Sequence, residues 1–102
     1  EIRRNGRVDR GLLGVSVDYL PAKLRKFTNN RGVLVTGVKS GTGADLAGIK
    51  EGDVILRVDG KTVLQPGELV GLISRRKPGD KVDVEIIRDY RTIQLTVTLG
   101  RR

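Results

Sequence analysis

Apolar and polar residues alternate through several short stretches of this chain, and this spacing predicts strands. Near the start, Leu13, Val15 and Val17 fall on one face of an extended segment, and Gly14 and Ser16 fall on the other. The loop that leads into this segment has a glycine at each end, so successive backbone N–H groups there can face an anion together. We therefore expect a docking edge at residues 13–17, with an ordinary turn and core strand as the alternative.

The rest of the chain divides into further strands and two or three short helices. The expected strands cover residues 33–38, 53–58, 61–63, 82–86 and 93–99, with hairpin turns at Asp59-Gly60 and Asp89-Tyr90. The expected helices cover residues 20–27, a short stretch that ends at Gly48, and residues 65–76. This mixture predicts a small α+β domain built on a partly open sheet.

The helix expected over residues 65–76 has more apolar side chains than one buried face requires. Leu69 and Ile73 lie four residues apart and are sufficient for contact with the core. Val70 and Ser74 are then placed on an adjacent flank, where they are able to line a groove. In the helix expected over residues 20–27, Leu20, Leu24 and Phe27 share the apolar face.

A glycine-rich turn at residues 40–48 has some features of a dinucleotide-binding loop. Its third glycine position holds Leu46, the helix that follows has room for only one or two turns, and a second βαβ unit does not fit in the chain. We interpret the segment as a tight turn into a short helix that is capped by Gly48.

The amino-acid composition excludes several kinds of catalysis and metal binding. The 102 residues fit one domain, and Cys, His, Met and Trp are all absent. Thiol chemistry, His-assisted nucleophilic catalysis and an ordinary zinc site are thereby excluded, so we expect no catalytic residue, no metal and no cofactor. The chain also has no apolar run of the length that a membrane-spanning helix needs.

The net charge of +8 is concentrated at the two ends of the chain. Residues 1–31 have eight basic residues against three acidic ones, and residues 61–102 have nine against five. Such a charge permits a nucleic-acid surface, but three aromatic residues are too few for a base-stacking platform. A small basic nucleic-acid-binding domain therefore stays only as an alternative function.

The order of the motifs is similar to that of a known family. Leu12-Leu13-Gly14-Val15, the segment Ala47-Gly48-Ile49-Lys50-Glu51-Gly52-Asp53-Val54-Ile55-Leu56-Arg57-Val58-Asp59-Gly60, a helix, Pro78-Gly79-Asp80 and a closing hairpin together resemble a PDZ domain of the circularly permuted bacterial type. The opening Asn5-Gly6-Arg7-Val8-Asp9-Arg10 is similar to the junction between the protease domain and the first PDZ domain of HtrA (Do-like) serine proteases.

This resemblance, which runs from Asn5 to Leu99, implies a fold and its boundaries. The fold is a PDZ-like partly open β-barrel or sandwich of five to six strands with two to three short helices. Residues 1–9 are then a linker from a preceding protease domain, residues 10–100 the PDZ domain and residues 101–102 a tail. Two positions depart from the family pattern: Tyr90 stands where a glycine is common, and Glu68 stands where many animal PDZ domains have a histidine.

The resemblance also implies a site, in which a C-terminal or exposed apolar peptide segment adds as a strand beside residues 14–17. The amides of Leu13, Gly14 and Val15 receive the peptide carboxylate, and Arg10 supports them electrostatically. The peptide groove is lined by Leu12, Ser16, Val17, Val70, Ile73 and Ser74, together with Leu13 and Val15.

The implied role is to tether substrates, or to regulate an attached serine endopeptidase, in periplasmic or otherwise extracytoplasmic protein quality control. The implied partners are C-terminal peptides, exposed apolar segments of unfolded proteins and the chain's own protease domain, and nucleic acid is not among them. The parent is expected to be a homotrimer that is able to lie near a membrane, and the isolated fragment a monomer. The alternatives are an occluded groove that serves as a spacer or an oligomer contact, and a PDZ domain of an intramembrane metalloprotease or a secretion component.

Overall fold

The computed structural model describes residues 11–101, although not the side chains of Leu12 and Arg101. These residues form three helices and eight strands in the order β1 (Gly11–Leu12), β2 (Val15–Tyr19), α1 (Ala22–Thr28), β3 (Val33–Val38), α2 (Gly43–Ala47), β4 (Val54–Val58), β5 (Lys61–Thr62), α3 (Pro66–Ser74), β6 (Lys81–Arg88), β7 (Arg91–Thr98) and β8 (Gly100–Arg101). The linker expected over residues 1–9 lies outside the described residues. The expected α+β class is confirmed, and α3 is shorter than the 65–76 predicted for it.

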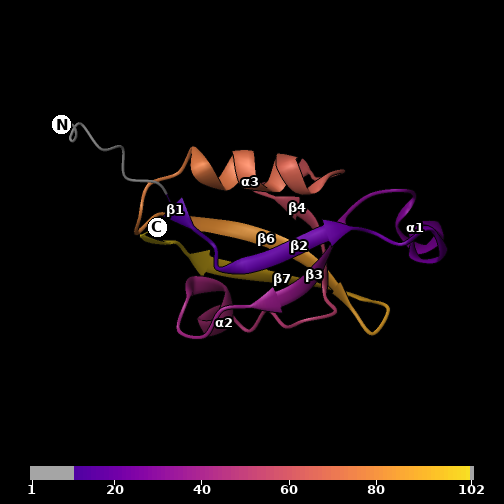
Figure 1. Cartoon of the computed structure of the whole chain (residues 1–102), viewed down its shortest axis with the longest axis horizontal. Coiled ribbons are helices and arrows are strands. Elements are labelled where there is room, and N and C mark those ends of the chain that lie inside the picture. The colour runs from indigo at the N-terminus through magenta and orange to yellow at the C-terminus, as the bar shows by residue number, and fades with distance from the viewer. Residues whose placement is uncertain (1–10, 102) are drawn as a thin grey trace.

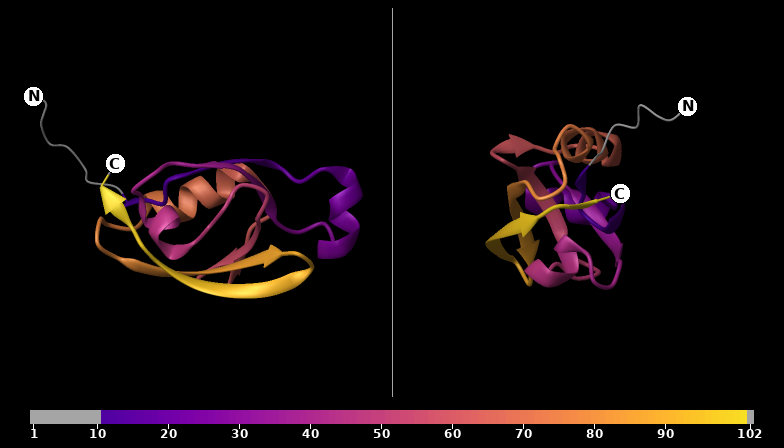
Figure 2. Two further views of the ribbon diagram at one scale, coloured as in Figure 1. Left: turned by 90° about the horizontal axis from the view of Figure 1, so that it is seen from below. Right: turned by 90° about the vertical axis from the view of Figure 1, so that its left-hand side faces the viewer.

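Two antiparallel sheets organise the described chain (Figure 1). The larger sheet has the order β2-β3-β4-β6-β7, with β5 added to β4, so β2 and β7 are its edges and it does not close into a barrel. The smaller sheet pairs β1 with β8 through Gly11 with Arg101 and Leu12 with Gly100. The two ends of the described chain therefore lie side by side, at the opposite end of the molecule from α1 (Figure 2).

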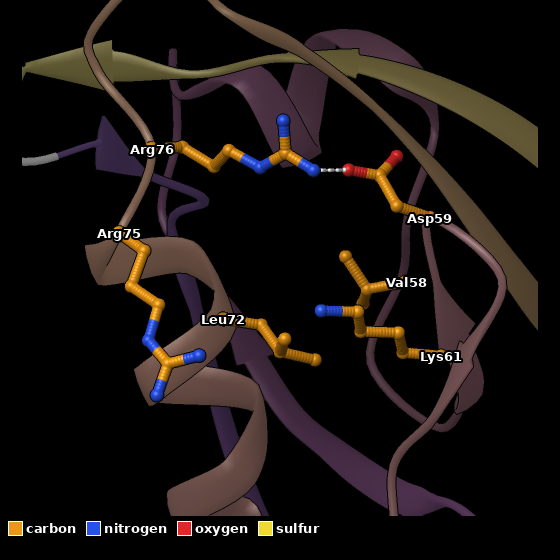
Figure 3. A pocket seen from close by; sticks show the side chains of 6 residues that line it. All are labelled: Val58, Asp59, Lys61, Leu72, Arg75 and Arg76. Carbon is orange, nitrogen blue, oxygen red and sulfur yellow. Dashed lines mark hydrogen bonds and ion pairs between the residues drawn. The ribbon is translucent and has the colours of Figure 1, made fainter.

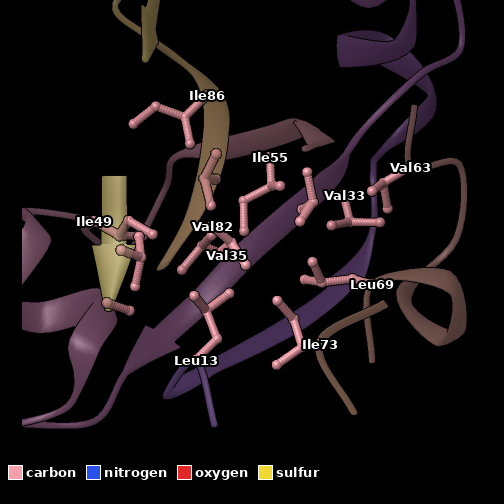
Figure 4. Close-up of a cluster of buried hydrophobic side chains, with 14 of the residues drawn as sticks. Leu13, Val33, Val35, Ile49, Ile55, Val63, Leu69, Ile73, Val82 and Ile86 are labelled. Atoms are coloured by element: carbon pink, nitrogen blue, oxygen red, sulfur yellow. The ribbon is translucent and has the colours of Figure 1, made fainter. Parts of the chain in front are cut away.

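The apolar core lies between the larger sheet and the helices α2 and α3 (Figure 4). The alternating strands supply most of it, and α3 supplies Leu69 and Ile73, as the sequence predicts. The fully buried side chains of greatest volume are Ile55, Ile86, Leu99, Val33, Val35, Val63, Val82, Val84 and Val97. Burial of each such side chain contributes about 1.5–3 kcal/mol, so the core holds α3 firmly beside β1 and β2.

The prediction for the face of α1 is wrong at Phe27. Leu20, just before the helix, and Leu24 pack into a second apolar cluster, but Phe27 is 62% exposed. The helix begins only after Pro21, and its last residue Thr28 occupies the buried position. Phe27 instead meets Tyr90 edge-on, with 5.4 Å between the ring centroids.

Tyr90 lies in the predicted hairpin turn between β6 and β7. Asp89 and Tyr90 both have left-handed backbones, with φ of 51° and 64°. This is the pair of conformations that a two-residue type I′ turn requires, and it normally favours glycine. The hairpin is therefore formed without the glycine that the family pattern has at this position, and the Tyr90 ring packs against Phe27.

An ion pair between the half-buried Arg88 and the buried Asp53 fastens the loop before β4 to β6. Arg88 donates from Nε to Asp53 Oδ1 at 2.9 Å and from Nη2 to Asp53 Oδ2 at 2.6 Å, and Nη2 also donates to the Gly48 carbonyl at 2.7 Å. Asp53 Oδ2 accepts a further bond from the Lys50 N–H at 2.8 Å. The hydrogen bond to Asp53 raises the pKa of Arg88 above its ordinary value. The loop that follows α2 is thus fixed to the sheet.

Candidate functional site

The first residues of β2 have an open backbone edge. The Lys39 N–H donates to the Gly14 carbonyl at 2.8 Å, and Val15 lies opposite Val38 in the ladder between β2 and β3. Gly14 precedes Val15 and Lys39 follows Val38, so this hydrogen bond lies just beyond the pair. In an antiparallel ladder, such a bond means that Val15 and Val38 are not hydrogen-bonded to each other. The N–H and C=O of Val15 therefore point away from β3, and those of Ser16 point toward it.

The same alternation holds further along β2, beyond a register shift after Ser16. The Val35 N–H donates to the Asp53 carbonyl at 2.8 Å, and the Val35 carbonyl accepts from the Gly52 N–H at 2.9 Å. Both groups of Val35 therefore point toward the β4 side of β3. Leu34 therefore turns its polar groups toward its partner Asp18 on β2. It follows that Val17 and Tyr19, like Val15, direct their N–H and C=O to the edge that no other described strand occupies.

The side chains along β2 divide as the sequence predicts. Val15 and Val17 are half-buried and pack against the core, while Ser16 and Asp18 are exposed on the opposite face. Ser16 lies in a hollow of about 360 Å³ that also contains Gly14, Val15, Gly37, Val38 and Lys39. Lys39 was not among the predicted residues, because only the pairing of Val15 with Val38 brings it beside Gly14.

The loop before β2 presents backbone N–H groups in succession. The carbonyls of Leu13 and Gly14 accept from Ala44 and Lys39 at 2.9 and 2.8 Å. The N–H groups of Leu13 and Gly14 donate to none of the described residues, although both residues are buried. Buried amides of this kind require an acceptor that the described residues do not supply, and the carboxylate site expected at Leu13, Gly14 and Val15 would provide one.

Gly14 fixes the shape of this loop. Its φ is +94°, a left-handed value that side chains other than glycine rarely adopt. A Cβ at this position would also come within 2.1 Å of Thr42 Oγ1. The glycine therefore allows the loop to approach the N-terminus of α2, because the Thr42 side chain occupies the space that a larger residue would need.

The flanks of α3 differ in what they face. On one flank, Leu72, Arg75 and Arg76 face Val58, Asp59 and Lys61 across a cavity of about 70 Å³, with an ion pair from Arg76 to Asp59 (Figure 3).

The other flank of α3 contains Val70, because a helix with 3.6 residues per turn places it beside the core residues Leu69 and Ile73. Since α3 runs alongside β1 and β2, this flank faces the β2 edge. Val70 is 54% exposed there, and Ser74 is partly exposed.

Glu68 has a structural role at the start of α3. Its Oε1 accepts from the N–H groups of Leu64 and Gln65 at 2.8 and 3.0 Å, as one half of a capping box. Glu68 also lines the flank of α3 that faces β5, together with Lys61 and Thr62. The carboxylate therefore serves the helix end, away from the β2 edge.

Two predicted site residues are described only in part or not at all. Arg10 lies outside the described residues, and the backbone of Leu12 is placed in β1 without a description of its side chain. Within residues 11–101, no group of three or more acidic side chains is arranged to hold a metal ion. No helix of that same region has the length and apolarity to cross a membrane.

An open antiparallel edge, a helix beside it and a loop whose N–H groups bond none of the described residues are together typical of small modules that accept an extended peptide as an added strand. The comparison with family models gives the particular family. Residues 11–99 match the model described as the PDZ domain. The chain therefore belongs to the PDZ family, as its motifs predict.

Curated relatives are bacterial proteases. The chain is 35% identical over 103 residues to a probable periplasmic serine endoprotease, DegP-like, of Ectopseudomonas mendocina, which covers 98% of this chain and 22% of that protein. It is 35% identical over 97 residues to the periplasmic pH-dependent serine endoprotease DegQ of Escherichia coli, in an alignment that covers 92% of this chain and 21% of DegQ. The chain thus spans about a fifth of the length of the curated relatives it matches. The match falls on the PDZ module, which is not the catalytic part of these proteases.

Solved structures have the same fold. The HtrA-type protease AlgW with tripeptide gives a TM-score of 0.86 at 31% identity, covering 99% of this chain and 35% of that one. AlgW with decapeptide gives 0.84 at 31% identity, covering 96% and 31%. The HtrA3 PDZ domain bound to a phage-derived ligand gives 0.76 at 17% identity and covers 93% and 89%, a likeness of fold alone.

Proposed function

We propose that this chain is the peptide-binding PDZ domain of an HtrA-type serine protease, and that it takes C-terminal or exposed apolar segments as an extra strand on β2. The observation that carries the proposal is the open edge of β2, whose outward groups on Val15 and Val17 continue directly from the amides of Leu13 and Gly14. Main-chain hydrogen bonds along such an edge provide affinity, and pockets for alternate side chains provide specificity.

The alternation along β2 gives the register of the guest strand. The last residue of an antiparallel guest lies opposite Val15, with its carboxylate at the loop amides and with Arg10 as a further cationic contact. The third residue from the end lies opposite Val17. The side chains of these two guest residues point toward α3, where Val70 is exposed and Ser74 partly exposed beside the buried Ile73.

The pocket for the last side chain is aliphatic. Leu13 and Ile73 are buried, Val15 and Val17 are half-buried, and Val70 is exposed on the flank of α3. A charged side chain would lose its hydration there without gaining a partner, which costs several kcal/mol. A small or medium apolar last residue is therefore the preferred one.

The relatives support the wider setting of the proposal. The curated ones are named periplasmic serine endoproteases, and the AlgW structures are described with a tripeptide and a decapeptide. In this setting the domain tethers substrates, or regulates an attached protease of a trimeric parent, in an extracytoplasmic compartment. A PDZ domain of an intramembrane metalloprotease or a secretion component is the alternative that these names do not favour.

Matched peptides test the proposal by titration calorimetry. Hexapeptides that end in valine, leucine, isoleucine or phenylalanine are compared as free acids and as C-terminal amides. The best acid is expected to bind with a dissociation constant on the order of micromolar. The C-terminal amide of the same peptide should bind at least about thirty-fold more weakly, because it loses charge-assisted hydrogen bonds and places its own N–H donors against the backbone N–H donors of the loop. Equal affinities of acid and amide would contradict the carboxylate site, and tight binding of short DNA at physiological salt without peptide binding would favour the basic nucleic-acid-binding alternative.

A further inference from the structure

The third outward N–H of the β2 edge is occupied by its own neighbour. The Tyr19 N–H donates to Asp18 Oδ1 at 2.7 Å. Tyr19 follows Val15 and Val17 in the series of residues whose polar groups point to the open edge. A guest strand therefore finds open N–H groups at Val15 and Val17 and a blocked one at Tyr19.

The Asp18 carboxylate is otherwise uncommitted within the described chain. The residue is exposed, and the ion pairs among the described residues are those of Arg76 with Asp59 and Arg88 with Asp53. Asp18 therefore presents a hydrated negative charge at the edge of the sheet, bonded to one backbone amide.

The register places one guest residue opposite this carboxylate. If the last guest residue lies opposite Val15 and the third from the end opposite Val17, the fourth from the end lies opposite Asp18. Directly opposed residues on one face of an antiparallel pair have Cβ atoms about 4.5–5.5 Å apart, and opposite charges there attract. The fifth residue from the end would need the Tyr19 N–H for one of its two backbone bonds.

We propose that Asp18 selects peptides with a cationic side chain at the fourth position from the end, and that in neutral peptides it withholds the Tyr19 N–H from the fifth residue. This inference rests on the proposed function and specifies its ligand. The second part follows from the bond to Tyr19, because the carbonyl of the fifth guest residue finds this N–H occupied unless the carboxylate moves, and only the Tyr19 carbonyl is open to that residue. The selection follows from the charge of Asp18 and its place in the register.

A simpler role for Asp18 is protection of the edge. Charged side chains on edge strands discourage pairing with other sheets, without any effect on the choice of a guest. In that case the affinity for peptides would not depend on where a lysine stands in the guest, and replacement of Asp18 would change the affinities for all peptides alike.

The selection is tested with the host peptide acetyl-Ala-Gly-Ala-Ser-Ala-Val and three variants that have lysine at the second, third or fourth position from the end. Fluorescence anisotropy competition measures the affinities for the unmodified chain, for Asp18→Asn and for Glu51→Gln. Glu51 is an exposed loop residue, so its replacement removes the same charge away from β2. Lysine at the fourth position should raise the affinity about two- to fivefold, as an exposed ion pair does. The gain should vanish in Asp18→Asn, persist in Glu51→Gln and be absent for lysine at the third position.

The effect on the Tyr19 N–H is tested with Asp18→Ala, which removes the acceptor of this N–H. An acetylated neutral tetrapeptide has its acetyl carbonyl in the place of the fifth residue's carbonyl, so it should bind Asp18→Ala more tightly than it binds the unmodified chain. An acetylated tripeptide with the same ending does not reach Tyr19 and should bind both proteins alike. Circular dichroism checks that each variant is folded. If peptides bind but show neither pattern, the role of Asp18 is overturned and the proposed function stands. If no peptide binds the unmodified chain, the proposed function itself is contradicted.

Discussion

Gly14 and Thr42 lie so close together that a Cβ on Gly14 would be 2.1 Å from Thr42 Oγ1. The Thr42 hydroxyl donates to the Lys39 carbonyl at 2.7 Å, and the Lys39 N–H donates to the Gly14 carbonyl at 2.8 Å. The loop before β2, the end of β3 and the N-terminus of α2 are therefore one packed unit. The amides of the candidate carboxylate site are positioned by this unit.

The first prediction concerns the packing of Gly14 against Thr42. Gly14→Ala should destabilise the domain more than Gly41→Ala, because both glycines have positive φ but only Gly14 has a neighbour where the Cβ would lie. We expect Gly41→Ala to lower the free energy of unfolding by about 1–2 kcal/mol, and Gly14→Ala by roughly 1–3 kcal/mol more. Urea unfolding measures both, and equal losses would show that the contact with Thr42 relaxes freely.

The second prediction concerns the flank of α3 that faces β2. Val70→Asp should weaken peptide binding by about 1–3 kcal/mol, since it places a carboxylate beside the last apolar side chain of the guest. The fold should persist, because Val70 is exposed. Leu46→Asp is the matched control, since Leu46 is exposed on α2. Calorimetry of both variants decides the matter, and an unchanged affinity for Val70→Asp would mean that this flank does not line the groove.

The third prediction compares two ion pairs. Arg88→Ala should lower the free energy of unfolding by about 3–5 kcal/mol, because it leaves the buried Asp53 carboxylate without its partner. Arg76→Ala, which breaks the more exposed pair with Asp59, should cost at most about 1 kcal/mol. Arg88→Lys should restore only part of the loss, since an ammonium does not reproduce the fork that meets both Asp53 oxygens and the Gly48 carbonyl. Similar losses for Arg88→Ala and Arg76→Ala in urea unfolding would contradict this ranking.

The fourth prediction is that stability is nearly independent of pH between about 6 and 9. The chain has no His and no Cys, so no side chain has its ordinary pKa in this window. The pKa of Arg88 is raised, chiefly by its hydrogen bond to Asp53. Its contribution is complete below the unfolded value and is lost only as the pH rises through the folded value, in strong alkali. Thermal unfolding across the window should give a flat profile, and a sigmoidal change within it would contradict the prediction.

The fifth prediction concerns the aromatic contact at the end of the molecule near α1. A double-mutant cycle with Phe27→Ala and Tyr90→Gly should give a coupling of about 0.5–1.5 kcal/mol, the value of an edge-on aromatic pair. Tyr90→Gly alone should cost little, because glycine suits the left-handed backbone that Tyr90 adopts. Additive effects of the two changes would show that the rings do not stabilise each other.

The elements that sequence predicts best are those with a regular apolar spacing, of two residues in a strand or of about 3.6 in a helix. The hairpin around Asp89 and Tyr90 is confirmed, as is the buried face of α3 at Leu69 and Ile73, because in each case burial follows directly from spacing. The prediction is wrong at Phe27 because α1 begins at Ala22, so Leu20 lies before the helix and does not define its buried face. Leu24 and Thr28, which are four residues apart, form that face.

The parts that sequence does not reveal depend on contacts between distant residues. Arg88 meets Asp53 across 35 positions of the chain, and no local pattern indicates that pairing. The bond from Tyr19 to Asp18 is local, but its meaning depends on which edge of β2 is open, and this is fixed by the strand order. The carboxylate and groove residues remain predictions that the peptide experiments above test.

The pairing of β1 with β8 has a mechanical consequence. Because Gly11 lies opposite Arg101, a force that pulls the two ends of the domain apart acts first on this two-residue ladder and only afterwards on the core. The chain runs from β1 directly into Leu13 and Gly14, so the same force would reach the candidate carboxylate site as soon as the ladder opened. Tension between the two ends of the domain would then disturb this site before it unfolded the sheet.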